Sequence, residues 1–361
     1  MPIISPFESS IAKAGEGKVV LSLLPPAIPS LSTLTYKYPL KLLTRTPGFV
    51  PQSALTSAST PVHLYLLTYG GGLLPGDQID VSITLEPQTR LVVTTPQGST
   101  KIFKTETSPG RTLSDQSRQA LDVRIGKEAA LCYLPDPSAP FKDSRYEQIQ
   151  TFTVDSTAKD STRSSLCVLD WVTQGRVSRG ENWDFHVWKG KNEIWMADES
   201  SASPTTPEEG NTQKPKRKLL LRDALILNDE TTSKTPGSEP QDLFHPSKSL
   251  IRERTSPHGV IGTLILYGPV FESLSSFFVD RFTSLPRIGA RNWSTSAPAA
   301  SESTPHYDSK VTFTAARVRA GCVLVKFGAE DFEAARDWLG AVLREEGSIA
   351  REFGEEALLC V

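Results

Sequence analysis

YLLTYGGGLLPGD, which runs from Tyr65 to Asp77, is the most informative stretch of the chain for its fold. It begins as an apolar strand, breaks at three consecutive glycines, and turns through Pro75 and Gly76 onto a carboxylate. Apolar and polar residues then alternate from 79 to 86, which is the period of a half-buried strand. The glycines are therefore predicted to form a tight bend between two strands.

This bend shares its glycine spacing with phosphate-binding loops but lacks their chemistry. Gly71 and Gly76 are spaced as in such a loop, yet Asp77 stands where the phosphate-binding lysine belongs. A carboxylate repels phosphate, whereas it can hold a hydrated cation or accept hydrogen bonds from backbone amides. The acid in place of the lysine thus excludes a nucleotide site and leaves two interpretations of Asp77: a cation ligand or a cap of the turn.

The composition excludes binding through bulk charge, because 39 basic residues balance 41 acidic ones in a chain of 361 residues. No nucleic acid or membrane partner is expected. The cysteines lie far apart and lack the paired spacing of a zinc or redox site, so they are predicted to be free thiols of a reducing compartment. They are Cys132, Cys167, Cys322 and Cys360. The first twenty residues lack the pattern of a secretory signal, and we expect a soluble, cytoplasmic protein.

Beyond the bend, short β-type runs recur at intervals of about ten residues, a rhythm typical of all-β proteins. They are 90–95, 121–125, 129–133, 149–154 and 166–171. This rhythm alone favours a sandwich or a barrel. Two segments, 271–285 and 329–346, have apolar residues at helical spacing and are predicted to be helices.

The chain is predicted to form a single domain over residues 15–361, preceded by a loose N-terminus at 1–14. Three segments are rich in Ser, Thr, Pro and Glu and are predicted to be flexible insertions in surface loops. They span about 199–217, 229–249 and 294–309.

Two polar clusters interrupt the strand rhythm. LPDPSAPFKDSRYEQ (134–148) carries Asp136 and Asp143 on a proline-rich loop, and TQGRVSRGENW (173–183) carries arginines beside Glu181. Such charges are rarely buried unless they are paired. The second cluster therefore suits either an ion-pair network or the lining of a polar passage.

The sequence contains no HExxH or GxSxG motif and no cluster of Cys or His. His63 and His186 lie outside the predicted insertions and are candidate metal contacts. A carboxylate-dependent hydrolase that cleaves polysaccharides on an all-β solenoid remains the alternative function. Its acids would be Asp77, Asp136, Asp143 and Glu181.

Five motifs in order resemble one family. They are YPLKLL (38–43), YLLTYGGGLLPGD, TPQGSTKIFK (95–104), LPDPSAPFKDSRYEQ and TQGRVSRGENW. Together they look like the UreD (UreH) urease accessory proteins. The resemblance covers about Gly15 to Met196, and more thinly Leu264 to Arg291 and the C-terminal helix. The long insertions suggest a eukaryotic member of the family, of the fungal kind.

The resemblance implies a chaperone scaffold rather than an enzyme. Such a scaffold binds apo-urease and, through a UreF-type bridging protein, recruits a UreG-type GTPase so that nickel reaches the urease active site. Nickel would be transient cargo, and no tightly bound cofactor is implied. The implied fold is a long structure like a right-handed β-helix, with about two helices in its C-terminal half.

The resemblance also implies roles for individual residues. The acids of the family's motifs fall on Asp77, Asp136, Asp143 and Glu181, which would form a transient nickel path through an internal polar passage. Oxygen ligands without thiolates suit such a path, because they bind nickel weakly enough to release it. The motif residues expected to line the passage or form ion pairs are Thr100, Lys101, Arg176 and Arg179.

Overall fold

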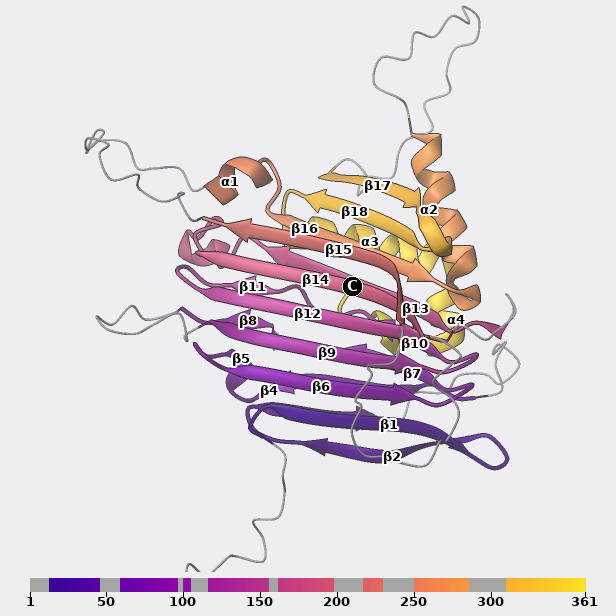
Figure 1. Ribbon diagram of the computed structural model, residues 1–361. Helices are drawn as coiled ribbons and strands as arrows, with labels where there is room; N and C mark the ends of the chain where they lie inside the picture. Colours follow the sequence, from indigo (N-terminus) through magenta and orange to yellow (C-terminus); the bar gives the residue numbers. More distant parts are fainter. Residues whose placement is uncertain are drawn as a thin grey trace, which may run out of the picture.

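A computed structural model describes residues 13–45, 59–96, 100–104, 116–155, 162–197, 217–229, 250–285 and 310–361. The predicted loose N-terminus and the three predicted insertions lie outside the described residues, apart from residues 13, 14, 217 and 229. Figure 1 shows two large stacked sheets, with helices behind one of them and three very short strands at one end.

The strands form three sheets. The strands of each sheet are given below in their spatial order, so that adjacent names are hydrogen-bonded neighbours. The seven-stranded sheet contains β15 (Arg217–Asn228), β14 (Val187–Ala197), β12 (Arg145–Val154), β9 (Ser117–Ile125), β6 (Gln78–Leu85), β1 (Glu16–Leu24) and β2 (Ile28–Tyr36). The eight-stranded sheet contains β17 (Val311–Arg317), β18 (Val323–Ala329), β16 (Val260–Tyr267), β13 (Ser165–Thr173), β10 (Ala130–Tyr133), β7 (Arg90–Thr94), β4 (Val62–Thr68) and β3 (Leu40–Arg45). The short sheet contains β11 (Ala139–Pro140), β8 (Lys101–Ile102) and β5 (Gly72–Leu73).

The middle of the chain visits these sheets in rotation. Each turn contributes one strand to the eight-stranded, the short and the seven-stranded sheet, as in β4, β5 and β6, and successive turns pair in parallel. Antiparallel pairs, such as β1 with β2 and β14 with β15, flank this parallel part. The predicted mainly β class is confirmed. Both large sheets are mixed, and the β-helix remains a prediction.

The predicted glycine bend joins β4 to β6. A short 3₁₀ turn, Tyr69–Gly71, follows β4, and β5 precedes Asp77. Gly70, Gly71 and Gly76 all have positive φ, a conformation that side chains disfavour, which explains why glycine occupies these positions.

The interior between the two large sheets is unusually polar on one strand. Every second residue of β12 is buried, as a half-buried strand requires. These residues are Tyr146, Gln148, Gln150, Phe152 and Val154. Two of the five carry amides, so the interior is not purely apolar.

The structure contains both predicted helices and two shorter ones. Helices α2 (Glu272–Ser284) and α3 (Phe332–Glu346) confirm the predicted segments. The expectation of about two helices is too low, because α1 (Leu250–Thr255) and α4 (Ser348–Phe353) are also present. At six residues each, these are too short to show helical periodicity.

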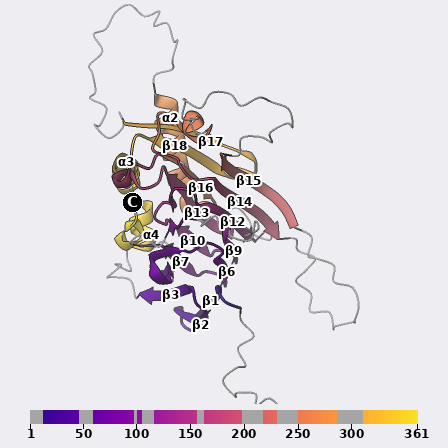
Figure 2. The ribbon, with the colours of Figure 1, turned by 90° about the vertical axis from the view of Figure 1, so that its left-hand side faces the viewer.

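Helices α2, α3 and α4 cover the outer face of the eight-stranded sheet, which Figure 2 shows edge-on. They enclose a second apolar core, separate from the one between the two large sheets, in which Phe278 packs beside Trp338. None of the helices in the described part of the chain is long and apolar enough to cross a bilayer.

Near the N-terminus, prolines lie both in the turn between β1 and β2 and within β2. Pro25 and Pro26 form the turn after β1, but Pro29 lies inside β2. Strand β2 is at the edge of its sheet, where a residue without an N–H group is tolerated.

Candidate functional site

Asp77 caps the glycine-rich bend. Its carboxylate accepts a hydrogen bond of 2.8 Å from the backbone N–H of Leu74, and its own N–H donates to the Leu74 carbonyl at 3.0 Å. The side chain is half-buried. These bonds correspond to the turn-cap interpretation, although one carboxylate oxygen is enough to make the cap.

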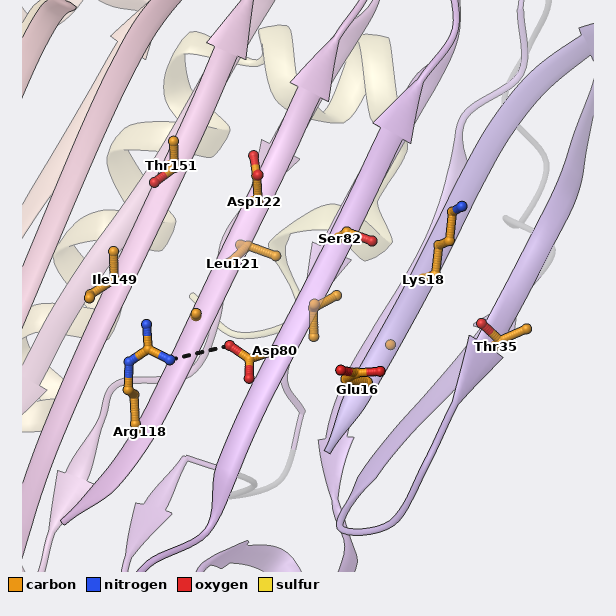
Figure 3. A pocket seen from close by; sticks show the side chains of 13 residues that line it. Glu16, Lys18, Thr35, Asp80, Ser82, Arg118, Leu121, Asp122, Ile149 and Thr151 are labelled. Atoms are coloured by element: carbon orange, nitrogen blue, oxygen red, sulfur yellow. Dashed lines mark hydrogen bonds and ion pairs between the residues drawn. The ribbon is translucent and has the colours of Figure 1, made fainter. Parts of the chain in front are cut away.

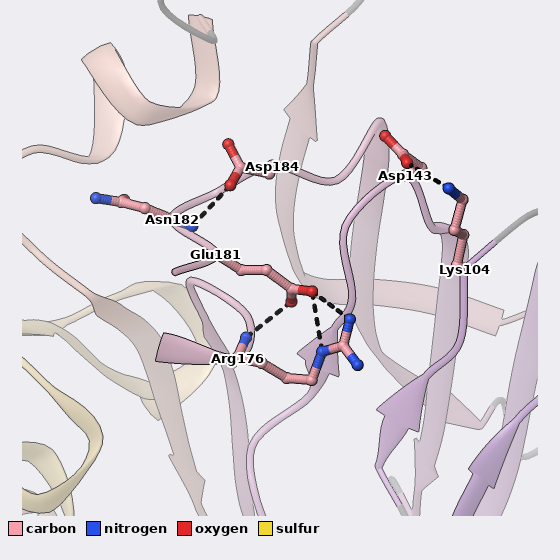
Figure 4. Close-up of polar contacts among 6 residues, drawn as sticks. All are labelled: Lys104, Asp143, Arg176, Glu181, Asn182 and Asp184. Carbon is pink, nitrogen blue, oxygen red and sulfur yellow. Dashed lines mark hydrogen bonds and ion pairs between the residues drawn. The ribbon is translucent and has the colours of Figure 1, made fainter. Parts of the chain in front are cut away.

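Glu181 is held by Arg176, as Figure 4 shows. Glu181 Oε2 accepts a hydrogen bond of 3.0 Å from the Arg176 backbone N–H, and Glu181 Oε1 accepts one of 2.9 Å from Arg176 Nε. A short contact from Arg176 Nη2 to the same Oε1 completes the ion pair. The Glu181 side chain is only 6% exposed. Burial alone would raise the pKa of Glu181, but the hydrogen bonds from Arg176 outweigh it and lower the pKa.

The same arginine fixes its loop to the short sheet. The Arg176 guanidinium carbon lies 3.8 Å from the centre of the Phe141 ring, a cation–π contact. Glu181 and Arg176 thus form an ion pair in which the carboxylate is buried and the guanidinium is partly exposed.

Asp143 is also paired. Its carboxylate lies 3.1 Å from Lys104 Nζ and 3.9 Å from His186 Nε2 (Figure 4 shows the lysine pair). Asp143 has φ of 63° and therefore occupies a left-handed position within the proline-rich loop.

The remaining predicted residues lie around the short sheet. The Thr100 hydroxyl donates a hydrogen bond of 2.6 Å to the Pro137 carbonyl. Lys101 is an exposed residue of β8. Arg179 is exposed on a 3₁₀ turn, Val177–Arg179, that follows β13. Its guanidinium makes no ion pair with any residue that the structure describes.

Asp136 lies beside a small internal cavity. The cavity, about 20 Å³ in volume, is enclosed by residues of all three sheets and has room for a water molecule. Asp136 and Thr100 line both this cavity and an open surface cleft of about 340 Å³. Two of the residues expected at a passage therefore stand between the surface and the interior.

The cavity also meets Asp170, a carboxylate that the sequence analysis missed. Asp170 is buried in β13 and accepts hydrogen bonds from Gln148 Nε2 at 3.0 Å and from Asn192 Nδ2 at 2.7 Å. Burial raises the pKa of Asp170 to about 6. The sequence feature that could have identified Asp170 is its position as a single acid within the apolar run LCVLDWVT, Leu166–Thr173.

The polar interior continues from Asp170 to the edge of the sheets. Asn192 pairs in register with Asp223 of β15, and Asp223 forms an ion pair of 2.6 Å with Lys326 of β18. Asn192 Oδ1 and both amide atoms of Gln150 are buried without a hydrogen-bond partner among the described residues. Unpartnered oxygens of this kind are available to a polar guest.

The four predicted acids do not gather at one point. Within the described ranges, no group of three or more His, Cys, Asp or Glu side chains is arranged to hold a metal ion. His63 is buried and its Nε2 lies 2.9 Å from the Phe353 carbonyl, so it joins β4 to α4. Cys132, Cys167, Cys322 and Cys360 are all free and buried, as predicted.

A second hollow of about 550 Å³ lies on the outer face of the seven-stranded sheet. Figure 3 shows charges of both signs on it, including an ion pair of 3.4 Å between Arg118 and Asp80. None of the residues of the predicted nickel path lines this hollow.

Comparison with known proteins supplies the context for this geometry. The sequence model of the family described as "UreD urease accessory protein" matches residues 15–358. The chain is 30% identical over 357 residues to "Urease accessory protein 4" of Cryptococcus neoformans, covering 95% of this chain and 93% of that protein. It is 31% identical to an "Uncharacterized urease accessory protein ureD-like" of Schizosaccharomyces pombe, over 84% of each chain. It is 38% identical to "Urease accessory protein D" of Arabidopsis thaliana, over 45% of this chain and 49% of the plant protein.

Proposed function

This chain belongs to the UreD family of urease accessory proteins, and we propose that it is a non-enzymatic scaffold that delivers nickel to apo-urease. In this proposal, a UreF-type protein bridges the scaffold to a UreG-type GTPase that supplies the metal. The assembly works in the cytoplasm, where the four free thiols stay reduced.

The observation that carries the nickel proposal is the polar interior. Thr100 and Asp136 connect the surface cleft to the internal cavity, and Asp170 extends the polar contacts to Asn192. We propose that the parallel turns form a short β-helix-like body around this path. Its donors are carboxylate, amide and hydroxyl oxygens, which bind a borderline cation weakly enough to pass it on.

The scaffold proposal assigns different duties to the four acids. Asp136 lies on the path, whereas Glu181 and Asp143 hold the loops at its mouth through Arg176 and Lys104. Asp77 shapes the glycine bend and offers its second oxygen to passing nickel.

The test is maturation of urease from purified or co-expressed components, with and without this chain, scoring urease activity and bound nickel. Omission of the chain should leave urease without nickel and inactive. If urease matures equally well without the chain, the scaffold proposal is wrong.

Two conservative variants separate the path from the fold. Asp77→Asn keeps an oxygen that caps Leu74, and Glu181→Gln keeps an acceptor for the Arg176 N–H, while both lose the charge. We expect both variants to assemble with apo-urease but to load less nickel. Asp77→Ala, which also removes the cap, should lose about 1 kcal/mol of stability as well. Normal nickel loading by both conservative variants would contradict a role for these charges in transit.

The alternative of a polysaccharide-cleaving hydrolase gains no support. Asp143 and Glu181 are each held by a basic partner and Asp77 caps a turn, so no pair of these acids is shown facing a common groove.

A further inference from the structure

Two rows of polar side chains face each other between the large sheets. One row consists of register partners on the eight-stranded sheet: Asp170 of β13, Thr263 of β16 and Lys326 of β18. The other consists of register partners on the seven-stranded sheet: Gln150 of β12, Asn192 of β14 and Asp223 of β15. Two contacts join the rows. Asn192 Nδ2 donates a hydrogen bond of 2.7 Å to the Asp170 carboxylate, and Lys326 Nζ donates one of 2.6 Å to Asp223. The polar interior therefore runs from the cavity that Asp170 lines to the end of the stack where β15 meets β18 (Figure 1).

The rows change from buried to exposed toward this end. Thr263 is only 5% exposed, whereas the side chains of Asp223 and Lys326 are 11% and 51% exposed. Thr314, the register partner of Lys326 on the outermost strand β17, is exposed as well. The polar interior therefore reaches the surface a second time, at residues that do not line the cleft beside the short sheet.

The ion pair between Asp223 and Lys326 is not required for packing. Asp223 stands between Leu221 and Leu225 on the inner side of β15, and both leucines pack against the core between the large sheets. Exchanging a buried ion pair for apolar residues often leaves stability unchanged or raises it. In register with Asp223, the Oδ1 of Asn192 is buried and has no hydrogen-bond partner among the described residues. A charged pair next to an unpartnered oxygen suits the handling of a polar guest better than the holding of an edge.

The charges of this pair also act on Asp170. Burial is the main cause of the raised pKa of Asp170, the negative charge of Asp223 raises this pKa further, and the positive charge of Lys326 lowers it. The carboxylate beside the cavity and the ion pair near the surface are therefore linked electrostatically.

We propose that the Asp223–Lys326 ion pair closes the second opening of the polar path, and that a nickel ion coming from Asp170 opens it by displacing Lys326 from Asp223. This inference rests on the proposed nickel scaffold and adds the means by which its path is kept shut. The lysine ammonium repels a divalent cation, so free metal ions in solution meet a barrier at this opening. A cation that reaches Asp223 from inside also meets Asn192 Oδ1, and carboxylate and amide oxygens hold nickel weakly enough to release it.

The first experiment measures binding of Ni²⁺ to the full chain by equilibrium dialysis. Lys326→Met removes the ammonium group and leaves the Asp223 carboxylate without its partner. The matched control is Arg317→Met, which frees Glu272 from an ion pair of the same length, 2.6 Å, on the surface. We expect Lys326→Met to bind one more Ni²⁺ than the native chain, or to bind it at least about tenfold more tightly, and the control to bind as the native chain does. Unchanged binding by Lys326→Met, or an equal gain in the control, overturns the inference.

A second substitution assigns the gained binding to Asp223. The variant Lys326→Met/Asp223→Asn keeps the shape of both side chains and removes the carboxylate charge, so it should lose the gain in Ni²⁺ binding. Thermal unfolding of both variants checks that the fold is retained. A gain in binding that survives Asp223→Asn places the metal elsewhere and contradicts the proposal.

The third experiment separates transfer of the metal from support of the fold. Asp223→Leu/Lys326→Met replaces the pair with apolar side chains, and Glu272→Leu/Arg317→Met does the same at the surface pair. Each variant is assembled with apo-urease and its accessory partners, and the nickel bound to urease after a fixed time is measured by mass spectrometry. We expect at least about fivefold less nickel with the first variant and native loading with the second. Native loading with both shows that the Asp223–Lys326 pair serves the fold alone and overturns the inference.

The two proposals fail separately. If urease matures equally well without the chain, the scaffold proposal is wrong, whatever the dialysis shows. If maturation depends on the chain but Lys326→Met binds Ni²⁺ no better than the native chain, the scaffold stands and only the closing role of the ion pair is wrong.

Discussion

Asp170 is the residue at which burial and ionisation conflict most clearly. It lies between the two large sheets, and its carboxylate is held by the amides of Gln148 and Asn192 rather than by a cation. Two neutral donors do not compensate for the loss of water around a charge, so the pKa of Asp170 rises to about 6. An acid with this pKa is mostly ionised at neutral pH and mostly protonated below about pH 6.

The raised pKa predicts how stability depends on pH. Asp170 has an ordinary pKa near 3.9 in the unfolded chain, so both states are protonated below about pH 4. Between about pH 4 and pH 6 the unfolded chain loses its proton and the folded chain keeps it, which lowers the free energy of unfolding as pH rises. The loss reaches about 3 kcal/mol above pH 6. Asp170→Asn lacks this loss, so its stability relative to the native chain should increase by up to this amount between pH 4 and pH 7.

Urea unfolding at pH 4 and pH 7 measures this difference. The Asn192 amide can turn so that its unpartnered Oδ1 accepts from the new amide. Glu181→Gln is the matched control with the opposite sign, because the pKa of Glu181 is lowered and the native charge stabilises the fold at neutral pH. If the difference in the free energy of unfolding between Asp170→Asn and the native chain stays constant with pH, the pKa of Asp170 is not raised in the folded chain.

Among the secondary-structure elements, β14 and β15 form a hairpin whose ends meet. Ala197 and Arg217 are partners in register, although segment 198–216 separates them in the chain. The two strands pair along most of their length, with one irregularity at Ile194 and Trp195. The strands therefore do not depend on the connecting segment to find each other.

Replacing 198–216 with the two-residue turn Asn-Gly should preserve the fold. This turn matches the twist of antiparallel strands, and shortening the loop lowers the entropy cost of closing it by about 2 kcal/mol. We expect thermal unfolding at the same or a higher temperature and unchanged urease maturation. A Gly/Ser segment of the original length is the control for sequence. A variant that unfolds, beside an intact control, would show that the hairpin needs the longer connection.

Across the molecule as a whole, two apolar cores share one sheet. Strand β13 contributes Leu166 and Val168 to the core between the large sheets, and Cys167 and Leu169 to the core under the helices. Because alternate residues of one strand belong to different cores, loss of either core removes support from the other. The sharing favours the predicted single domain over residues 15–361.

Cooperative unfolding tests this prediction. Hydrogen exchange followed by mass spectrometry at increasing urea should show peptides from 145–154 in the inner core and 332–346 in the outer core losing protection at the same urea concentration. Loss of protection in 332–346 at a clearly lower concentration would divide the chain into two units.

Patterns of residues along the chain were sufficient to predict the local structure and the family. Alternation predicted the strands around the glycine bend, helical spacing predicted α2 and α3, and the order of five motifs indicated the UreD family. These signals are readable because backbone conformation and the choice of buried face depend on residues a few positions apart. The same argument explains the omission of α1 and α4, whose six residues hold less than two turns.

Which polar groups from distant parts of the chain meet was settled by the three-dimensional packing. Asp77 and Glu181 make contacts within their own motifs, with Leu74 and Arg176, which are three and five residues away. Asp170 sits in no such motif, and the amides that hold it come from strands 22 residues away on either side in the chain. Their meeting depends on the parallel register of successive turns and on how the two sheets face each other. Register is fixed by packing over the whole molecule, so no local pattern of residues reveals it.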